Sequence, residues 1–193
     1  MILTARTGYD DLRITAFEPK TSAPAQTDFS TTPASYLLQS WAFANNSTER
    51  GLNGVTQIPH GWVAGTDAYL HLHISSTGAL AEGAVPGLFC SLLVQKDGVA
   101  EGDAYKKLLF LSKTVPVGGY GAKTHIRTDA FTIPAANLGI SALVRVYVFR
   151  KKATELATDN LGAVTENIND VLWFDEVDIH VKCNRFGTAT PTA

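Results

Sequence analysis

Apolar and polar residues alternate along much of the chain, and this alternation predicts strands rather than helices. Eight segments rich in leucine, β-branched and aromatic residues lie between breaks of Gly, Pro, Asn and Asp. Runs of this kind are typical of strands. The predicted strands are residues 36–44, 52–58, 68–76, 87–95, 106–115, 123–133, 141–150 and 171–182. The sequence of residues 133–139 predicts one tight turn. The sequence of residues 151–162 predicts a short helical turn within a loop.

The absence of crossover helices in this pattern decides how the strands pair. Parallel neighbours need connections of a dozen or more residues, usually helical, whereas antiparallel neighbours do not. We therefore expect an all-β fold, an antiparallel eight-stranded β-sandwich. We expect residues 36–183 to form this domain. We expect residues 1–35 to form an extended N-terminal arm and residues 184–193 a flexible C-terminal tail, since both ends are rich in polar and small residues without apolar periodicity.

The period of two also assigns side chains to the faces of two strands. In residues 68–76, one face carries Ala68, Leu70, Leu72 and Ile74, and the other carries Tyr69, His71, His73 and Ser75. In residues 171–182, one face carries Val171, Trp173, Val177, Ile179 and Val181, interrupted by Asp175. The opposite face carries Leu172, Phe174, Glu176, Asp178, His180 and Lys182.

Charge and composition narrow the classes of partner. The chain has 193 residues, a net charge of −2 and 45% hydrophobic residues. The chain has no excess of basic residues that would favour binding to nucleic acid or to anionic lipid. It also has no apolar run that approaches the roughly 18 residues of a membrane span. We therefore expect no nucleic-acid and no membrane partner. Cys90 and Cys183 are expected to be buried free thiols, and the N-terminus lacks a secretory signal, which indicates synthesis in a cytosol.

The pair His71 and His73 is the strongest candidate for chemistry. Histidines two apart on a strand point to the same side and could ligate a metal, with His125 as a third ligand. His180, Glu176 and Asp178 could join them if residues 171–182 lie beside residues 68–76. The glutamate that follows the His-x-His pair in cupins is missing here. The interpretation we favour makes the histidines cross-strand partners of acidic residues on a half-exposed or subunit-facing surface.

Other catalytic patterns are missing from the sequence. It contains no GxSxG, P-loop or HExxH motif, and no GxGxxG before a helix. We therefore expect no catalytic residues, no metal and no cofactor. The basic run at residues 149–152 is interpreted as a solvated strand end that could meet an acidic patch on a partner.

Four phrases together resemble structural proteins of tailed bacteriophages. They are "YDDLRI" at residues 9–14, "IPHGWVAGTDAYLHLHI" at 58–74, "ISALVRVYVFRKKA" at 140–153 and "VLWFDEVDIHVKCNRFGTA" at 171–189. Tyr9 stands where these proteins usually have tryptophan. The resemblance implies a virion component, made in the bacterial host cytoplasm, with a sandwich of the jelly-roll kind.

Within that class we expect a non-enzymatic capsid decoration or cement protein that stabilises the capsid lattice. It would form an oligomer, with a trimer favoured, and bind the major capsid protein or other virion proteins. The residues expected to bind the partner lie in the N-terminal segment: Tyr9, Asp10, Asp11, Arg13, Phe17 and Phe29.

Two alternatives stay open at this point. The first is a tail-fibre, spike or head-fibre module that contacts a host glycan through loop residues such as Trp62, Asp67 and Tyr120. The second is a cupin-like metalloenzyme that uses His71 and His73 with His125.

Overall fold

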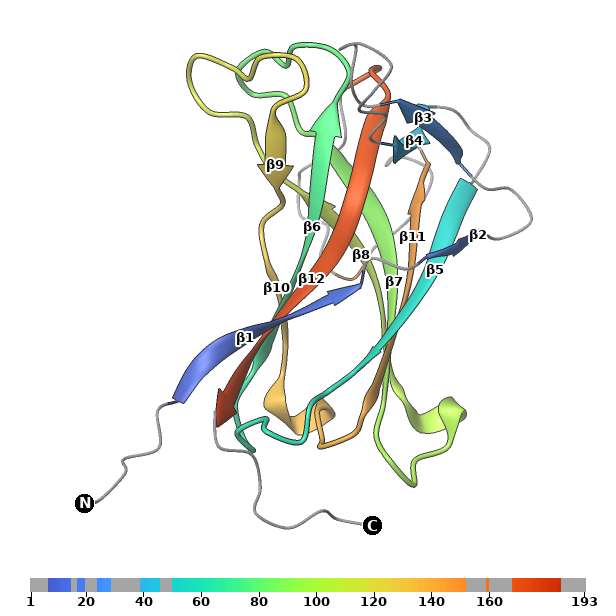
Figure 1. Cartoon of the computed structure of the whole chain (residues 1–193), viewed down its shortest axis with the longest axis vertical. Coiled ribbons are helices and arrows are strands. Elements are labelled where there is room, and N and C mark those ends of the chain that lie inside the picture. Colours follow the sequence, from blue (N-terminus) through green and yellow to red (C-terminus); the bar gives the residue numbers. More distant parts are fainter. Residues whose placement is uncertain are drawn as a thin grey trace.

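The computed structural model describes residues 7–14, 17–19, 24–28, 39–45, 50–151, 159 and 168–184, which form two packed antiparallel sheets (Figure 1). The larger sheet contains β1 (Thr7–Ile14), β3 (Ala25–Asp28), β4 (Gln39–Phe43), β6 (Ala68–Ser76), β9 (His125–Arg127), β10 (Phe131–Ile133) and β12 (Leu172–Asn184). The smaller sheet contains β2 (Glu18–Pro19), β5 (Arg50–Gln57), β7 (Gly87–Gln95), β8 (Tyr105–Ser112) and β11 (Leu143–Arg150). The predicted antiparallel β-sandwich is confirmed.

The order of the strands is that of a jelly roll. In the larger sheet β4, β12, β6 and β10 are neighbours, and in the smaller sheet β5, β11, β7 and β8 are neighbours. From β4 onward the chain changes sheet at every step except the β7–β8 hairpin and the passage from β9 to β10. Two interlocked Greek keys produce this alternation. The eight predicted strands correspond to β4–β12, with residues 123–133 divided into β9 and β10.

The division between β9 and β10 has a local cause at Thr128. Its hydroxyl oxygen accepts the N–H of Leu72 at 2.9 Å, where a backbone carbonyl of the sheet would otherwise accept it. Thr128 is itself buried, and its own N–H donates to the Leu72 carbonyl at 3.0 Å. A side chain therefore replaces part of the ladder along β6.

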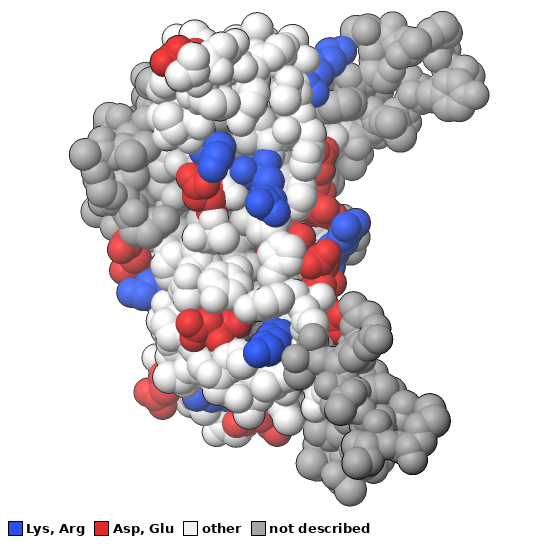
Figure 2. Space-filling model, turned by 90° about the vertical axis from the view of Figure 1, so that its left-hand side faces the viewer, with Lys and Arg blue, Asp and Glu red and all other residues white. Residues whose placement is uncertain are grey.

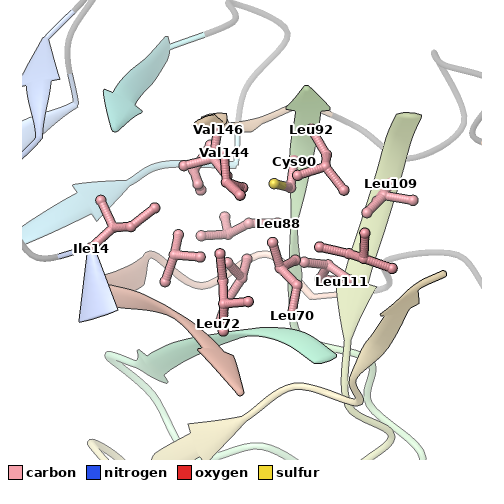
Figure 3. Close-up of a cluster of buried hydrophobic side chains, with 14 of the residues drawn as sticks. Ile14, Leu70, Leu72, Leu88, Cys90, Leu92, Leu109, Leu111, Val144 and Val146 are labelled. Atoms are coloured by element: carbon pink, nitrogen blue, oxygen red, sulfur yellow. The ribbon is translucent and has the colours of Figure 1, made fainter. Parts of the chain in front are cut away.

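The core lies between the two sheets (Figure 3). Leu70 and Leu72 of β6 project toward Leu88 and Cys90 of β7, and each of these four side chains is fully buried. Each buried leucine contributes roughly 1.5–3 kcal/mol through removal of apolar surface from water. The alternation predicted for β6 is correct, since Leu70, Leu72 and Ile74 face the core.

The face assignment predicted for β12 is wrong in its first half. Leu172 and Phe174 are fully buried in the core together with Val177. The pairing of β12 with β6 shifts register between Phe174 and Glu176, and such a bulge reverses which side chains face inward. Asp175 is exposed at this point and accepts a hydrogen bond from Ser40 Oγ of β4 at 2.6 Å.

Residues of the expected N-terminal arm take part in the sandwich. β1 pairs with β12 from Thr7 opposite Asn184 to Ile14 opposite Val177. Ile14 is 2% exposed in the core, and a Cβ atom at Gly54 of β5 would lie 2.6 Å from its Cγ2 atom. Gly54 thus leaves room for the Ile14 side chain to pack against β5 of the smaller sheet. The boundary at residue 35 stays a prediction.

Arg150, the last residue of β11, joins the two sheets. Its side chain is buried, and its Nη1 atom donates to the carbonyls of Phe43 at 2.7 Å and Asp170 at 2.6 Å. Its Nη2 atom donates to the carbonyl of Ile168 at 3.3 Å. For Arg150 the prediction of a solvated strand end is wrong, because these carbonyls at the end of β4 and the entrance to β12 need donors inside the protein.

Helical structure in the described part of the chain is limited to two short 3-10 turns, η1 (Glu101–Asp103) and η2 (Ala135–Asn137). η2 confirms the predicted tight turn, and Asp67 accepts the N–H of its first residue, Ala135, at 2.8 Å. The helical turn predicted within residues 151–162 falls almost wholly outside the described residues. None of the described helices has the length and apolar character needed to cross a membrane.

Candidate histidine–carboxylate site

Histidines and carboxylates converge on the outer face of the larger sheet, opposite the core. His71 and His73 of β6 project from this face because their neighbours Leu70, Leu72 and Ile74 point inward. β12 runs beside β6 with Asp178 opposite His71 and Glu176 opposite His73. The arrangement that the sequence analysis made conditional on this pairing is therefore present.

The imidazoles of β6 and β9 contact one another in a chain. His71 Nε2 lies 3.1 Å from His73 Nε2, and His73 Nδ1 lies 2.7 Å from His125 Nε2. The rings of His73 and His125 are stacked with centroids 4.9 Å apart. Neutral rings satisfy both contacts if His71 Nε2–H donates to His73 Nε2 and His73 Nδ1–H donates to His125. All three histidines proposed for a cupin-like site therefore meet, but on the outer face of the sheet.

Asp178 stands at the centre of the group. Its Oδ2 atom lies 3.5 Å from His71 Nε2, 3.7 Å from His73 Nε2 and 3.7 Å from His180 Nε2. The Asp178 side chain is 5% exposed, and its Oδ1 atom is buried without a hydrogen-bond partner in the described structure. Burying a carboxylate oxygen without a donor is costly. The hydrogen bonds of the site therefore compensate the negative charge of the Asp178 carboxylate only in part.

β1 extends the site along the other edge of β12. Asp11 Oδ1 lies 2.6 Å from His180 Nδ1, and Arg13 Nε lies 4.0 Å from Glu176 Oε1. The ring of His180 stacks on that of His71 with centroids 4.8 Å apart. Sequence reasoning placed Asp11 and Arg13 on a partner surface and missed their contacts with this site, because nothing in a short charged segment indicates which strand it will pair with.

Burial keeps the two histidines of β6 neutral at neutral pH. The pKa of His71 is lowered to about 4, mainly by burial and in addition by the charges of His180, His73 and Arg127. Burial also lowers the pKa of His73 and outweighs the Glu176 carboxylate, which raises it. Neutral imidazoles offer a nitrogen lone pair, either to a hydrogen bond or to a metal ion.

A pocket of about 560 Å³ opens beside His71 and His180. Its walls include Tyr9 of β1, the ion pair of Lys113 with Asp129, and Arg127, which contributes positive charge. Figure 2 shows the side of the molecule that lies on the left in Figure 1, where basic and acidic residues are interspersed. The pocket gives the outer edge of the site a route to solvent.

The favoured interpretation of the histidines is confirmed in its main point, since they are cross-strand partners of acidic residues. The surface is less open than expected, because His71 is 2% exposed. Among the residues that the structure describes, two sets of side chains have the proximity that a metal ion requires: His71, His73 and Asp178, and Asp11, Asp178 and His180. Asp178 belongs to both sets.

The other residues expected to bind a partner are distributed along β1 and beyond it. Tyr9 is 56% exposed, and Asp10 is exposed beside it. Phe17 packs edge-on against Phe174, with ring centroids 4.9 Å apart. Phe29 lies outside the described residues. The roles of these residues in binding stay predictions.

The three residues considered for glycan binding do not form one site. Trp62 is 7% exposed. Asp67 lies immediately before β6 and accepts the N–H of Ala135. Tyr120 pairs with Leu80, beyond the other end of β6. Asp67 and Tyr120 therefore lie at opposite ends of β6, a strand of nine residues that spans about 30 Å.

Comparisons with known proteins gave structural matches only. No protein-family model matches the chain, and no curated protein matches it in sequence. Among solved structures, a chain in the structure of infectious bursal disease virus, Gt strain, matches with a TM-score of 0.38 and 10% identity over 95% of this chain. A chain of the Gx strain structure matches with a TM-score of 0.38 and 12% identity over 96%. The present chain spans 33% of the length of each.

Proposed function

We propose that this protein is a non-enzymatic structural component of a bacteriophage particle, and specifically a capsid decoration or cement protein. In this role it binds the capsid lattice as an oligomer, with a trimer favoured, and ties neighbouring capsid subunits together. The jelly-roll body supplies rigidity, and the outer face of the larger sheet supplies the contact surface.

The observation that carries this proposal is where three of the four resembling phrases fall in the fold; the fourth, "ISALVRVYVFRKKA", contains β11 of the smaller sheet. "YDDLRI" forms β1, "VLWFDEVDIHVKCN" forms β12, and "AYLHLHI" is most of β6. These three strands are neighbours in the larger sheet, with β12 between β1 and β6. Phrases that are remote in sequence therefore gather on one sheet, which supports a shared surface rather than three unrelated resemblances.

The side chains at the edge of this surface have the character of a docking site. Tyr9 offers a large ring that is 56% exposed and lies 6.2 Å from Tyr69, measured between ring centroids. Tyrosine is enriched where protein interfaces derive most of their binding energy. Arg13 adds an exposed charge on the same face of β1 as Tyr9, whereas Asp10 projects from the opposite face beside Cys183. These features support binding to another protein, with Tyr9 as its apolar anchor.

The test uses purified protein and particles assembled from the genome that encodes it, with the gene for this chain deleted. Removal of residues 1–30 would also remove β1 and Ile14 from the fold, so point variants are needed. We expect the wild-type chain to co-sediment with the particles. The double variant Tyr9→Ala/Arg13→Ala should bind at least about tenfold more weakly, because alanine truncation of an interface tyrosine typically costs more than 1 kcal/mol.

Val117→Ala is the matched control, since Val117 is an exposed apolar residue outside the sheet. This variant should bind within about twofold of wild type. Full binding by the Tyr9/Arg13 variant would contradict the assignment of the surface to β1. Failure of the wild-type chain to bind any particle would contradict the virion role itself.

A further inference from the structure

The metal-binding potential of the outer face is independent of the virion role, and it rests on the buried group His71, His73 and Asp178. Their three ligand atoms are His71 Nε2, His73 Nε2 and Asp178 Oδ2. The nitrogens lie 3.1 Å apart, and the carboxylate oxygen lies 3.5 Å from the first and 3.7 Å from the second. The three atoms thus form a nearly equilateral triangle.

This triangle has the size of one face of a zinc coordination tetrahedron. Zinc binds imidazole nitrogen at about 2.0–2.1 Å and carboxylate oxygen at about 2.0–2.2 Å, which places tetrahedral ligands about 3.3–3.5 Å apart. A cation can therefore be accommodated with shifts of a few tenths of an ångström. By contrast, two of the same contacts, at 3.5 and 3.7 Å, are too long to be good hydrogen bonds.

We propose that His71, His73 and Asp178 bind one divalent transition-metal cation of the zinc type, which fastens β6 to β12 on the outer face of the larger sheet. Two imidazoles and one carboxylate make the ligand set, and the fourth position is left for water. Imidazole ligands favour zinc and its neighbours over magnesium or calcium, which prefer oxygen ligands.

The unpartnered oxygen of Asp178 is the independent sign that a ligand belongs here. Its side chain is 5% exposed, and Oδ1 has no hydrogen-bond donor among the described residues. A buried carboxylate in this condition destabilises the fold unless a positive charge lies beside it. Among the described residues, the ion-pair partners of Asp178 are histidines and include no lysine or arginine, whereas a bound divalent cation would supply the missing charge.

Groups beyond the three ligands orient them as metal sites require. Binding through Nε2 leaves His73 with its proton on Nδ1, and His125 Nε2 lies 2.7 Å from that atom, ready to accept it. Contacts of this kind fix the tautomer and the ring orientation of a ligating histidine. On the other side, His180 lies 3.7 Å from the Asp178 carboxylate and is held by Asp11 of β1. His125 is therefore a positioning residue rather than a ligand.

The test is to titrate the chelator-treated full-length chain with zinc chloride and to measure binding during the titration by calorimetry. We expect one zinc ion per chain and no comparable binding of magnesium. His73→Ala and Asp178→Asn should each weaken binding at least about 100-fold, and His125→Gln about tenfold, as expected for an outer-shell partner. His60→Ala is the control, because His60 is exposed and contacts Ser141 instead; it should bind like wild type.

A second measurement needs no variant and therefore does not depend on how the variants fold. Nitrogen-15 NMR of the histidines in the wild-type chain should show the Nε2 resonances of His71 and His73 move on addition of one equivalent of zinc, while His60 stays unchanged. The proposal is overturned if the wild-type chain binds no zinc at micromolar concentration. It is equally overturned if binding survives both ligand variants, or if only His60 responds.

Discussion

Replacing Arg150 with methionine tests how the two sheets are held together. Methionine keeps much of the length and apolar character of the side chain but removes the guanidinium. Three carbonyl oxygens then lose the hydrogen bonds from Arg150, those of Phe43, Asp170 and Ile168, although Ile168 keeps a hydrogen bond from Asn45 Nδ2 at 2.8 Å. Hydrogen bonds from a charged donor contribute about 1.5–3 kcal/mol each. Part of this is offset because the buried guanidinium no longer has to be desolvated, which costs several kcal/mol. We expect a net loss of about 3 kcal/mol in the free energy of unfolding.

The measurement is urea denaturation followed by the fluorescence of the tryptophans. The matched control is Arg145→Met, since Arg145 lies on the same strand with an exposed side chain. The control should change the free energy of unfolding by no more than about 0.5 kcal/mol. A loss of less than 1 kcal/mol in the free energy of unfolding for Arg150→Met, with an unchanged denaturant slope, would refute the reasoning that these carbonyls depend on hydrogen bonds from Arg150.

Two further predictions concern β1 and the cysteines. Ile14→Ala should lower the free energy of unfolding by about 3 kcal/mol, because Ile14 is 2% exposed in the core and its truncation leaves a cavity; a thermal or urea melt close to wild type would instead mean that β1 adds little to the sandwich. Burial raises the pKa of Cys90 to about 12 and, together with the Asp10 carboxylate, that of Cys183 to about 11. Because only the thiolate reacts, alkylation of either cysteine at pH 8 should be at least about 100-fold slower in the folded than in the urea-unfolded chain, and equal rates detected by mass spectrometry would contradict the burial.

The fold was predictable where one face of a strand is continuously apolar. The predicted bounds of β6 and β7 agree with the structure because one face of each strand is apolar along most of its length, with Leu70, Leu72 and Ile74 in β6 and Leu88, Cys90, Leu92 and Val94 in β7. β1 was missed, since only Leu12 and Ile14 are apolar in a segment rich in charge. The bulge of β12 was equally invisible, because an extra residue in a strand has no composition of its own. It reversed the assignment of Trp173 and Phe174.

The candidate site was predictable only as a set of alternatives. Histidines at positions 71 and 73 had to share a face, but their partners depend on which strand lies alongside. That choice is made by the whole sandwich, through the register that sets Asp178 opposite His71. The burial of Arg150 was unpredictable for the same reason, since its carbonyl partners lie 107, 20 and 18 residues away along the chain.

The most direct test of the virion role is a reconstruction by electron cryomicroscopy of particles from the genome that encodes this chain. The account predicts jelly-roll density of this size on the outside of the capsid shell, in multiples that reflect an oligomer. The strands β1, β12 and β6 should face the capsid subunits. Particles that contain no copy of the chain, in density and in their protein composition, would contradict it.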